Sequence, residues 1–230
     1  MYRIGTFSKV VRWVWASPGV VFFRKCINTF RPAAWLLGSL RGGPGRRQTD
    51  ALVWSGVGHF RASLYSELDA GGTVLTDYVN ATAKKSERIL DICCNQGRFL
   101  LDLRRKGFTD LYGFDIMGPA IELLKQNPDY DSKRISVEQC LAQDYFKSKA
   151  DNSFDWAITY SATIELIHPE FDIFAELKRT IRKGMILVLD EKRHSYPRFY
   201  RLLHRMNGFE IVVARKLDMD GLVLIHSVKQ

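Results

Sequence analysis

The clearest chemical signal in the sequence is a pair of carboxylates on two apolar runs. Asp91 lies in the run 88–93, which leads into a turn containing Asn95 and Gly97, and a stretch with helical spacing follows. A tight turn between a strand and a helix presents backbone N–H groups and the positive end of the helix to a ligand. Asp115 comes 18 residues after Gly97, near the end of the next apolar run. Acidic residues at about this spacing bind ribose hydroxyls in nucleotide-type sites, so the spacing predicts a nucleotide-like ligand.

These carboxylates need a scaffold that brings strand ends together. From residue 88 onward, short β-rich runs alternate with stretches of helical spacing, which is typical of β-α-β units and a mainly parallel sheet. The predicted strands are 88–93, 111–116, 135–140, 155–160, 185–190, 209–215 and 222–228. The short connection between the last two contains Asp220-Gly221 and predicts an antiparallel hairpin. The sequence therefore predicts an α/β, Rossmann-like fold: a mainly parallel seven-stranded sheet with helices on both faces and a C-terminal antiparallel hairpin.

The turn and the second carboxylate resemble the class I S-adenosylmethionine-dependent methyltransferase family. The first motif of that family is an acidic residue followed by three alternating glycines, and the second is an acidic residue ending the next strand. Asp91 matches the acidic position and Gly97 the last glycine, whereas Cys93 and Asn95 stand where the first two glycines usually are. Asn tolerates the left-handed conformation better than most side chains and Cys is small, so a tight turn remains possible.

The resemblance extends over about residues 88–228 and implies S-adenosylmethionine as the cofactor. It implies that the turn 91–97 packs against the methionine portion and that Asp115 bonds the ribose hydroxyls. Gln143-Asp144 follow the third strand, where the family commonly contacts the adenine amino group, and the fourth strand ends beside the transferring methyl. The predicted cofactor-binding residues are Asp91, Cys93, Asn95, Gly97, Asp115, Ile116, Gln143, Asp144 and Tyr160.

Plainer interpretations exist for each of these features. Asp91 alone could be a surface or capping carboxylate and Asp115 alone a loop acid; their order and spacing together favour the cofactor site. A nicotinamide site would need the spacing Gly-x-Gly-x-x-Gly, which residues 93–97 do not supply. The adjacent Cys93 and Cys94 are interpreted as inert small residues, because no neighbour in the sequence clearly lowers a thiol pKa.

The residues that would act on the methyl acceptor are predicted to be Glu165 and His168. They follow the fourth strand, in a segment that resembles the start of the acceptor-pocket helix of many small-molecule methyltransferases. Methyl transfer is an in-line displacement that depends mainly on alignment in a dry pocket, but a hydroxyl acceptor also needs a base. Imidazole, with an ordinary pKa of about 6.5, suits that role. In the alternative interpretation, Glu165 is solvated and His168 caps a helix beside Pro169; two candidate ligands are too few to predict a metal.

Two further features bear on the acceptor. The sequence contains neither Asn-Pro-Pro-Tyr nor Asp-Pro-Pro-Tyr, which argues against methylation of base amino groups. Basic and aromatic residues over 192–201 follow the fifth strand. They could receive an acidic acceptor or form a solvated helix face with its rings packed inward.

The N-terminal fifth of the chain differs from the rest in charge. Residues 1–49 contain no Asp or Glu, and after them the 25 remaining Lys and Arg balance the 25 Asp and Glu, so the whole net charge of +9 lies there. The nine basic residues are Arg3, Lys9, Arg12, Arg24, Lys25, Arg31, Arg41, Arg46 and Arg47. Such an arm could bind an anionic membrane surface, bind RNA, or pack as extra helices over the acceptor pocket. The apolar stretch 10–23 is interrupted by Arg12 and Pro18-Gly19 and is too short to span a bilayer, which takes roughly 20 apolar residues.

The sequence therefore predicts a basic, aromatic N-terminal arm over 1–48 and a methyltransferase domain over 49–230. Within that domain, 49–85 form a mainly helical lead-in with a break at Gly71-Gly72, and 86–230 form the core. The predicted activity is S-adenosylmethionine-dependent O-methylation of a small-molecule, glycan or lipid-linked acceptor. The alternatives are an RNA methyltransferase and a non-catalytic cofactor-binding scaffold. The predicted location is the cytoplasm, with the arm on the inner face of a membrane.

Overall fold

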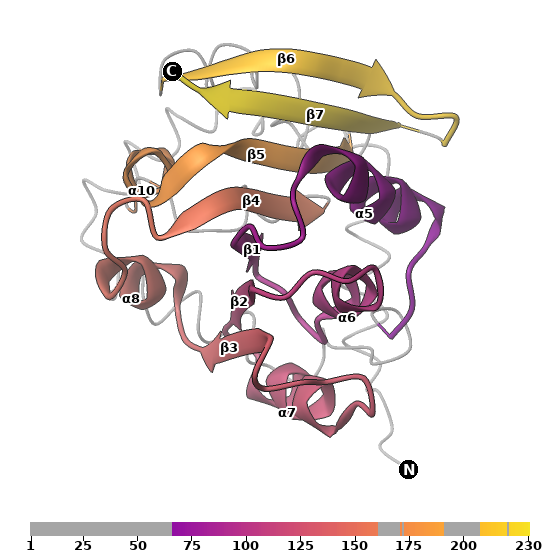
Figure 1. The fold of residues 1–230 in the computed structure, drawn as a ribbon, viewed down its shortest axis with the longest axis vertical. Coiled ribbons are helices and arrows are strands. Elements are labelled where there is room, and N and C mark those ends of the chain that lie inside the picture. Colours follow the sequence, from indigo (N-terminus) through magenta and orange to yellow (C-terminus); the bar gives the residue numbers. More distant parts are fainter. Residues whose placement is uncertain (1–65, 161–170, 172, 191–207, 220) are drawn as a thin grey trace, which may run out of the picture. The chain divides into compact units, whose positions relative to one another are not determined.

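The computed structural model describes residues 66–160, 171, 173–190, 208–219 and 221–230, all within the compact unit Gly45–Gln230 (Figure 1). The predicted arm, residues 1–48, and most of the helical lead-in lie outside these ranges. Within them, no helix has both the length and the apolar character needed to cross a bilayer.

A seven-stranded sheet organises this part of the chain, as predicted. Its strands lie in the order β3-β2-β1-β4-β5-β7-β6. Their bounds are β1 Ile89–Ile92, β2 Leu111–Asp115, β3 Ile135–Gln139, β4 Phe154–Tyr160, β5 Ile181–Asp190, β6 Phe209–Lys216 and β7 Leu222–Lys229. The first five strands pair in parallel, and β7 is antiparallel to both β5 and β6. Helical crossovers connect the parallel strands, whereas a short turn suffices between β6 and β7.

Helices cover both faces of the sheet (Figure 1). They are α5 Ala70–Thr82, α6 Arg98–Arg105, α7 Gly118–Gln126, α8 Ala142–Lys147 and α10 Ile173–Thr180. One buried cluster joins the sheet to α8 and α10 through Tyr145 and Leu177. The other joins the opposite face to α5, α6 and α7 and includes the fully buried Leu100 of α6. Neighbouring residues Ile89 and Leu90 point into different clusters, as the alternation of side chains along a strand requires.

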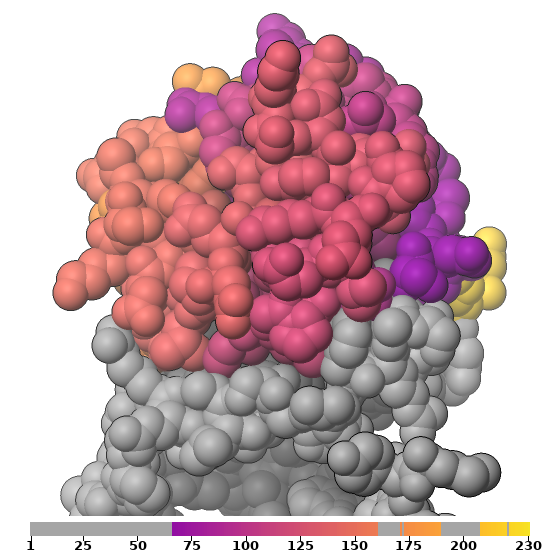
Figure 2. All heavy atoms as spheres, turned by 90° about the horizontal axis from the view of Figure 1, so that it is seen from below, coloured from indigo at the N-terminus to yellow at the C-terminus, as the bar shows by residue number. Residues whose placement is uncertain are grey.

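The parallel register brings the predicted site to one edge of the sheet. Asp91 lies beside Gly113 of β2 and Ile158 of β4, and Asp115 lies beside Gln139 of β3. The carboxyl ends of β1 to β4 therefore meet at the edge where open α/β sheets bind ligands. Seen from below, most of the described surface belongs to the middle of the sequence, drawn in magenta to salmon (Figure 2).

The predicted helix break at Gly71-Gly72 is wrong, because both glycines lie inside the first turn of α5. Asp69 caps this helix by accepting the N–H of Gly72 at 2.7 Å. A glycine costs a helix about 1 kcal/mol relative to Ala. Here the small residue is needed, since a Cβ on Gly71 would lie 2.6 Å from the hydroxyl oxygen of Tyr160.

Strand β5 begins four residues earlier than predicted, at Ile181 instead of residue 185. Its second and third residues are charged, so the apolar pattern hid this start: Arg182 pairs with Asp155 and Lys183 with Glu87. The register between β4 and β5 also shifts in this part of the pairing. Gly184 follows, where a Cβ would lie only 2.0 Å from the carbonyl oxygen of Ser227.

Candidate cofactor site

The turn after β1 has an alternating left-handed backbone. Cys93, Asn95 and Gly97 have φ values of 55°, 50° and 66°. A left-handed non-glycine residue costs roughly 1–2 kcal/mol, with Asn among the most tolerant. Cys93 and Asn95, which stand where the family has glycines, therefore have the left-handed backbone that favours glycine. Strain of this kind concentrates at functional sites.

Gly97 is required by packing as well as by its φ. It is the N-cap of α6, and a Cβ there would lie 2.6 Å from both terminal carbons of the Leu124 side chain on α7. The close approach lets α7 rest against the start of α6. This glycine fixes where the turn ends and where the first N–H groups of α6 point.

Asp115 connects the turn to the end of β2. Its Oδ2 accepts the backbone N–H of Asn95 at 2.8 Å, and its Oδ1 accepts the N–H of Met117 at 2.8 Å. The residue is 5% exposed, and burial raises its pKa against the opposing effect of these backbone N–H groups. The two loops expected to hold opposite ends of one ligand thus lie side by side.

Asp91 is buried without full compensation. It is 1% exposed, and among the described residues its Oδ2 has no hydrogen-bond partner. Burial raises its pKa well above the ordinary value; the Arg98 cation opposes that change and the nearby Asp115 adds to it. A buried polar atom left unpaired is costly and is often completed by a ligand. The ammonium and sulfonium of S-adenosylmethionine are cations of the kind such an oxygen lacks, so the residues present fit this cofactor.

The residues predicted on the adenine side lie at the same edge. Ile116 is half-buried directly after Asp115, while Gln143 is half-buried and Asp144 exposed in the first turn of α8. Cys140 bridges the two regions, because its N–H donates to the carbonyl oxygen of Asp115 at 3.0 Å. Burial and the nearby Glu138 raise the pKa of the Cys140 thiol to about 11, so the thiol stays neutral.

Tyr160, a predicted cofactor residue at the end of β4, contacts residues that the sequence analysis missed. Its ring lies 5.6 Å from that of Phe99, and the Arg98 guanidinium lies 5.1 Å from its centroid. Arg98 also donates to the carbonyl oxygen of Glu67 at 3.0 Å and pairs with Asp69 at 3.7 Å. The segment before α5 is therefore held against the end of β4. The position of Arg98, directly after the last motif glycine, was the available signal.

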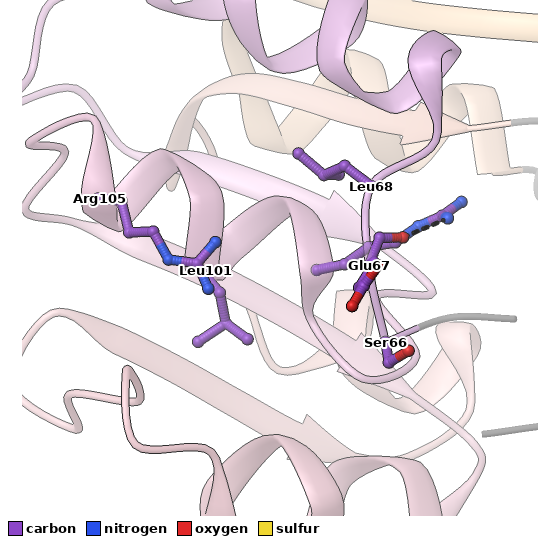
Figure 3. A pocket seen from close by; sticks show the side chains of 6 residues that line it. Ser66, Glu67, Leu68, Leu101 and Arg105 are labelled. Atoms are coloured by element: carbon purple, nitrogen blue, oxygen red, sulfur yellow. Dashed lines mark hydrogen bonds between the residues drawn. The ribbon is translucent and has the colours of Figure 1, made fainter. Parts of the chain in front are cut away.

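A pocket of about 230 Å³ opens beside α6. Ser66 and Glu67 lie on the segment before α5, whereas Leu101 and Arg105 lie on α6 (Figure 3). Arg105 is already paired with Asp129 at 2.7 Å. Because α6 and the segment before α5, and not the strand ends, form its wall, this pocket differs from the predicted cofactor site.

The predicted acceptor residues Glu165 and His168 lie outside the described residues. Within the described ranges, no three His, Cys, Asp or Glu side chains are grouped so that they could hold a metal ion. Within the described residues, Cys93, Cys94 and Cys140 form no disulfide. Burial raises the pKa of Cys94 well above its ordinary value, which agrees with the inert role expected for it.

Comparison with known proteins agrees with this geometry. Residues 89–184 match a family profile described as a methyltransferase domain. No curated protein matches the chain. Solved structures share the fold at low sequence identity. Magnesium protoporphyrin IX methyltransferase from Synechocystis, with bound S-adenosylmethionine, matches at 14% identity over 100% of both chains with a TM-score of 0.55.

Two further structures match a smaller share of the chain. The ribosomal protein L11 methylase from Lactobacillus delbrueckii subsp. bulgaricus is 14% identical, covering 70% of this chain and 77% of its own, with a TM-score of 0.53. An S-adenosylmethionine-dependent methyltransferase from Aquifex aeolicus is 14% identical, covering 70% of this chain and 90% of its own, with a TM-score of 0.53. At these identities the likeness shows the fold.

Proposed function

We propose that the chain is a class I S-adenosylmethionine-dependent methyltransferase that methylates an oxygen atom of a small-molecule, glycan or lipid-linked acceptor; the match of residues 89–184 to a methyltransferase-domain profile supports this. When bound, S-adenosylmethionine supplies an activated methyl group on its sulfonium. The observation that carries the cofactor assignment is the Asp91 Oδ2, which has no partner among the described residues and lies on β1 directly before the turn that is bonded to Asp115.

Each end of the site has a separate task in this proposal. Asp91 accepts a hydrogen bond from the ammonium group of the methionine portion, and Asp115 accepts from the ribose hydroxyls with the lone pairs that Asn95 and Met117 leave unused. Gln143 and Asp144 hold the adenine amino group. Tyr160 borders the place of transfer, supported by Phe99 and Arg98. The gain from Asp91 is large because the oxygen is already desolvated.

His168 is proposed as the general base and Glu165 as its partner. A hydroxyl must lose its proton as its oxygen attacks the methyl carbon, and an imidazole near its ordinary pKa accepts that proton at neutral pH. Exchange of His168 for Ala should then lower turnover more than cofactor binding. Equal turnover would remove His168 from the mechanism.

The test of the proposed function has two stages. Calorimetry with S-adenosylmethionine and S-adenosylhomocysteine measures cofactor binding, and transfer of a labelled methyl group is then screened over phenols, sugars, polyprenyl-linked glycans and RNA. We expect binding of both ligands and label on a hydroxyl-bearing acceptor. Absence of binding would refute the cofactor site, and labelling of RNA alone would refute the acceptor class.

The basic arm is proposed to hold the enzyme at an anionic membrane surface, where Arg and Trp share charged and apolar contacts. The support is the concentration of the whole charge excess in residues 1–49. Flotation with vesicles of phosphatidylglycerol and phosphatidylcholine, with and without residues 1–48, tests this. Loss of flotation on removal of the arm is expected. Flotation unchanged by removal, or a matching arm-dependent shift of RNA in a gel, would contradict it.

A further inference from the structure

Asn95 differs from the glycine it replaces in having a side chain that reaches from one loop to the other. Its Oδ1 accepts the N–H of Gln96 at 2.9 Å, and its Nδ2 lies 4.0 Å from the sulfur of Met117. Because only the amide oxygen can accept the Gln96 N–H, this bond fixes which way the amide faces. The two N–H donors of the side chain therefore point away from the turn and toward the loop after β2.

Among the residues that the structure describes, the side-chain donor on Asn95 has only a weak acceptor. A thioether sulfur is a poor hydrogen-bond acceptor, and 4.0 Å is a long contact. The same residue donates its backbone N–H to Asp115 Oδ2, so its amide stands next to the carboxylate that is assigned to the ribose. Each oxygen of the Asp115 carboxylate accepts one backbone N–H, that of Asn95 or that of Met117, and still has a lone pair. A ligand hydroxyl could therefore donate to Asp115 and accept from the half-buried side-chain amide of Asn95.

We infer that the side-chain amide of Asn95 is a specificity-determining contact for the adenosine portion of the cofactor. In this arrangement a ribose hydroxyl donates to Asp115 and accepts from Nδ2 of Asn95, replacing the weak contact with Met117. The inference rests on the proposed function, because it names one contact within that site. It explains why a side chain occupies a strained position that glycine fills without cost: the bond to the ligand offsets the left-handed backbone.

The chain contains a matched control for the backbone effect. Asn152 is also left-handed, with φ 54° against 50° for Asn95, but it is exposed and its N–H bonds the carbonyl oxygen of Arg179. Exchange of either Asn for Gly relieves the same strain. Only the exchange at Asn95 removes a donor from the site.

The experiment compares the wild type with Asn95→Gly and Asn152→Gly, using S-adenosylhomocysteine and 5′-methylthioadenosine as calorimetric probes. We expect Asn95→Gly to weaken both probes by a similar factor, about three- to tenfold, since one neutral hydrogen bond is lost. Its thermal midpoint should stay equal to or above that of the wild type. Asn152→Gly should bind both probes as the wild type does.

A third variant separates contact with the ligand from support of the turn. Asn95→Asp keeps an oxygen for the Gln96 N–H but has no amide donor and places a second negative charge beside Asp115. We expect it to bind both probes at least as weakly as Asn95→Gly. Binding restored by Asn95→Asp, binding unchanged in Asn95→Gly, or a loss confined to S-adenosylhomocysteine would each overturn the inference. A wild type that binds neither probe would instead refute the proposed function itself.

Discussion

The backbone N–H of Asn95 donates to Oδ2 of Asp115 at 2.8 Å, which ties the turn after β1 to the end of β2. The other oxygen of the same carboxylate accepts the N–H of Met117, at the cap of α7. One buried side chain therefore holds two loops in place before any ligand arrives. Its role in binding cannot be separated from its role in the fold by a single truncation.

Asp115→Ala is expected to reduce both stability and cofactor affinity. Two N–H groups would lose their acceptor, at about 1–3 kcal/mol for each that stays buried without a partner. Urea denaturation without ligand should show this loss, and calorimetry with S-adenosylhomocysteine should show binding reduced at least tenfold. Asp115→Asn keeps one acceptor oxygen, so its stability and its affinity should lie between those of Asp115→Ala and the wild type. Stability equal to the wild type in Asp115→Ala would contradict the bracing role.

Asp91→Asn is expected to stabilise the ligand-free protein while weakening cofactor binding. The substitution removes a buried carboxylate whose Oδ2 is unpartnered among the described residues and whose pKa burial raises. An amide is cheaper to bury than an ionised carboxylate but attracts an ammonium group less. Chemical denaturation at pH 8 should therefore give the variant a higher free energy of unfolding than the wild type. Calorimetry should give the variant a lower affinity for the cofactor.

The pH dependence of that difference has a definite sign. A carboxyl with a raised folded-state pKa favours the native state at low pH and loses that contribution as pH rises from about 3.9 through the folded pKa. The stability advantage of Asp91→Asn should therefore grow with pH and level off above the folded pKa of Asp91. An advantage that shrinks with rising pH would show that Asp91 is paired in the native state.

The strands were predictable because the core is built from apolar runs of strand length. Strands β1 and β2, which contain Asp91 and Asp115, are buried on both faces, as parallel strands between helices must be, and such apolar runs stand out in a sequence. The start of β5 was hidden because Arg182 and Lys183 satisfy their charges against Asp155 and Glu87 at the sheet margin. Hydrophobic periodicity cannot report such long-range ion pairs.

The site was predictable only where it follows the strands. The turn and Asp115 sit at fixed places in β-α-β units, so their spacing locates them. The contact of Arg98 with Glu67 and Asp69 joins positions about thirty residues apart through packing that no local pattern encodes. The same holds for Gly71, where a side chain is excluded by the hydroxyl of Tyr160, which lies far away in the sequence on β4.

His226 is expected to make the protein less stable as pH falls below about 6.5. It is 8% exposed on β7, bonded through Nδ1 to the Tyr78 hydroxyl at 3.1 Å and packed 5.3 Å from the Trp156 ring. Burial lowers its pKa, so the unfolded chain takes up a proton before the native state does. Stability from this residue is present above the unfolded pKa and is lost as pH falls from there through the folded pKa.

The measurement compares wild type and His226→Phe by urea denaturation between pH 8 and pH 5. Taking the difference removes the opposite slope contributed by Asp91 and Asp115, and the Glu87–Lys183 pair beside Trp156 is common to both proteins. The wild type should lose stability relative to the variant as pH falls. A stability difference between the two proteins that stays constant with pH would mean that His226 titrates alike in the folded and unfolded states.

Gly97→Ala should be the most damaging of the small substitutions in the turn, and the chain offers a control that divides its cost. The backbone at this position has a left-handed φ of 66°, and the new Cβ would lie 2.6 Å from the Leu124 side chain. Gly107 has a φ of 93°, but a Cβ there would meet nothing within 4 Å. Gly107→Ala should therefore cost about 1–2 kcal/mol for backbone strain alone. Gly97→Ala should cost about 2–5 kcal/mol, because overpacking adds to the strain.

Shortening Leu124 to Ala in the Gly97→Ala background removes the collision but not the strain. The cost of the Gly97 exchange, measured in a chain that carries Leu124→Ala, should therefore fall toward that of Gly107→Ala. Equal costs for the two glycines in the wild-type background would show that α7 moves aside freely and that its contact with the turn does not hold the cofactor loop.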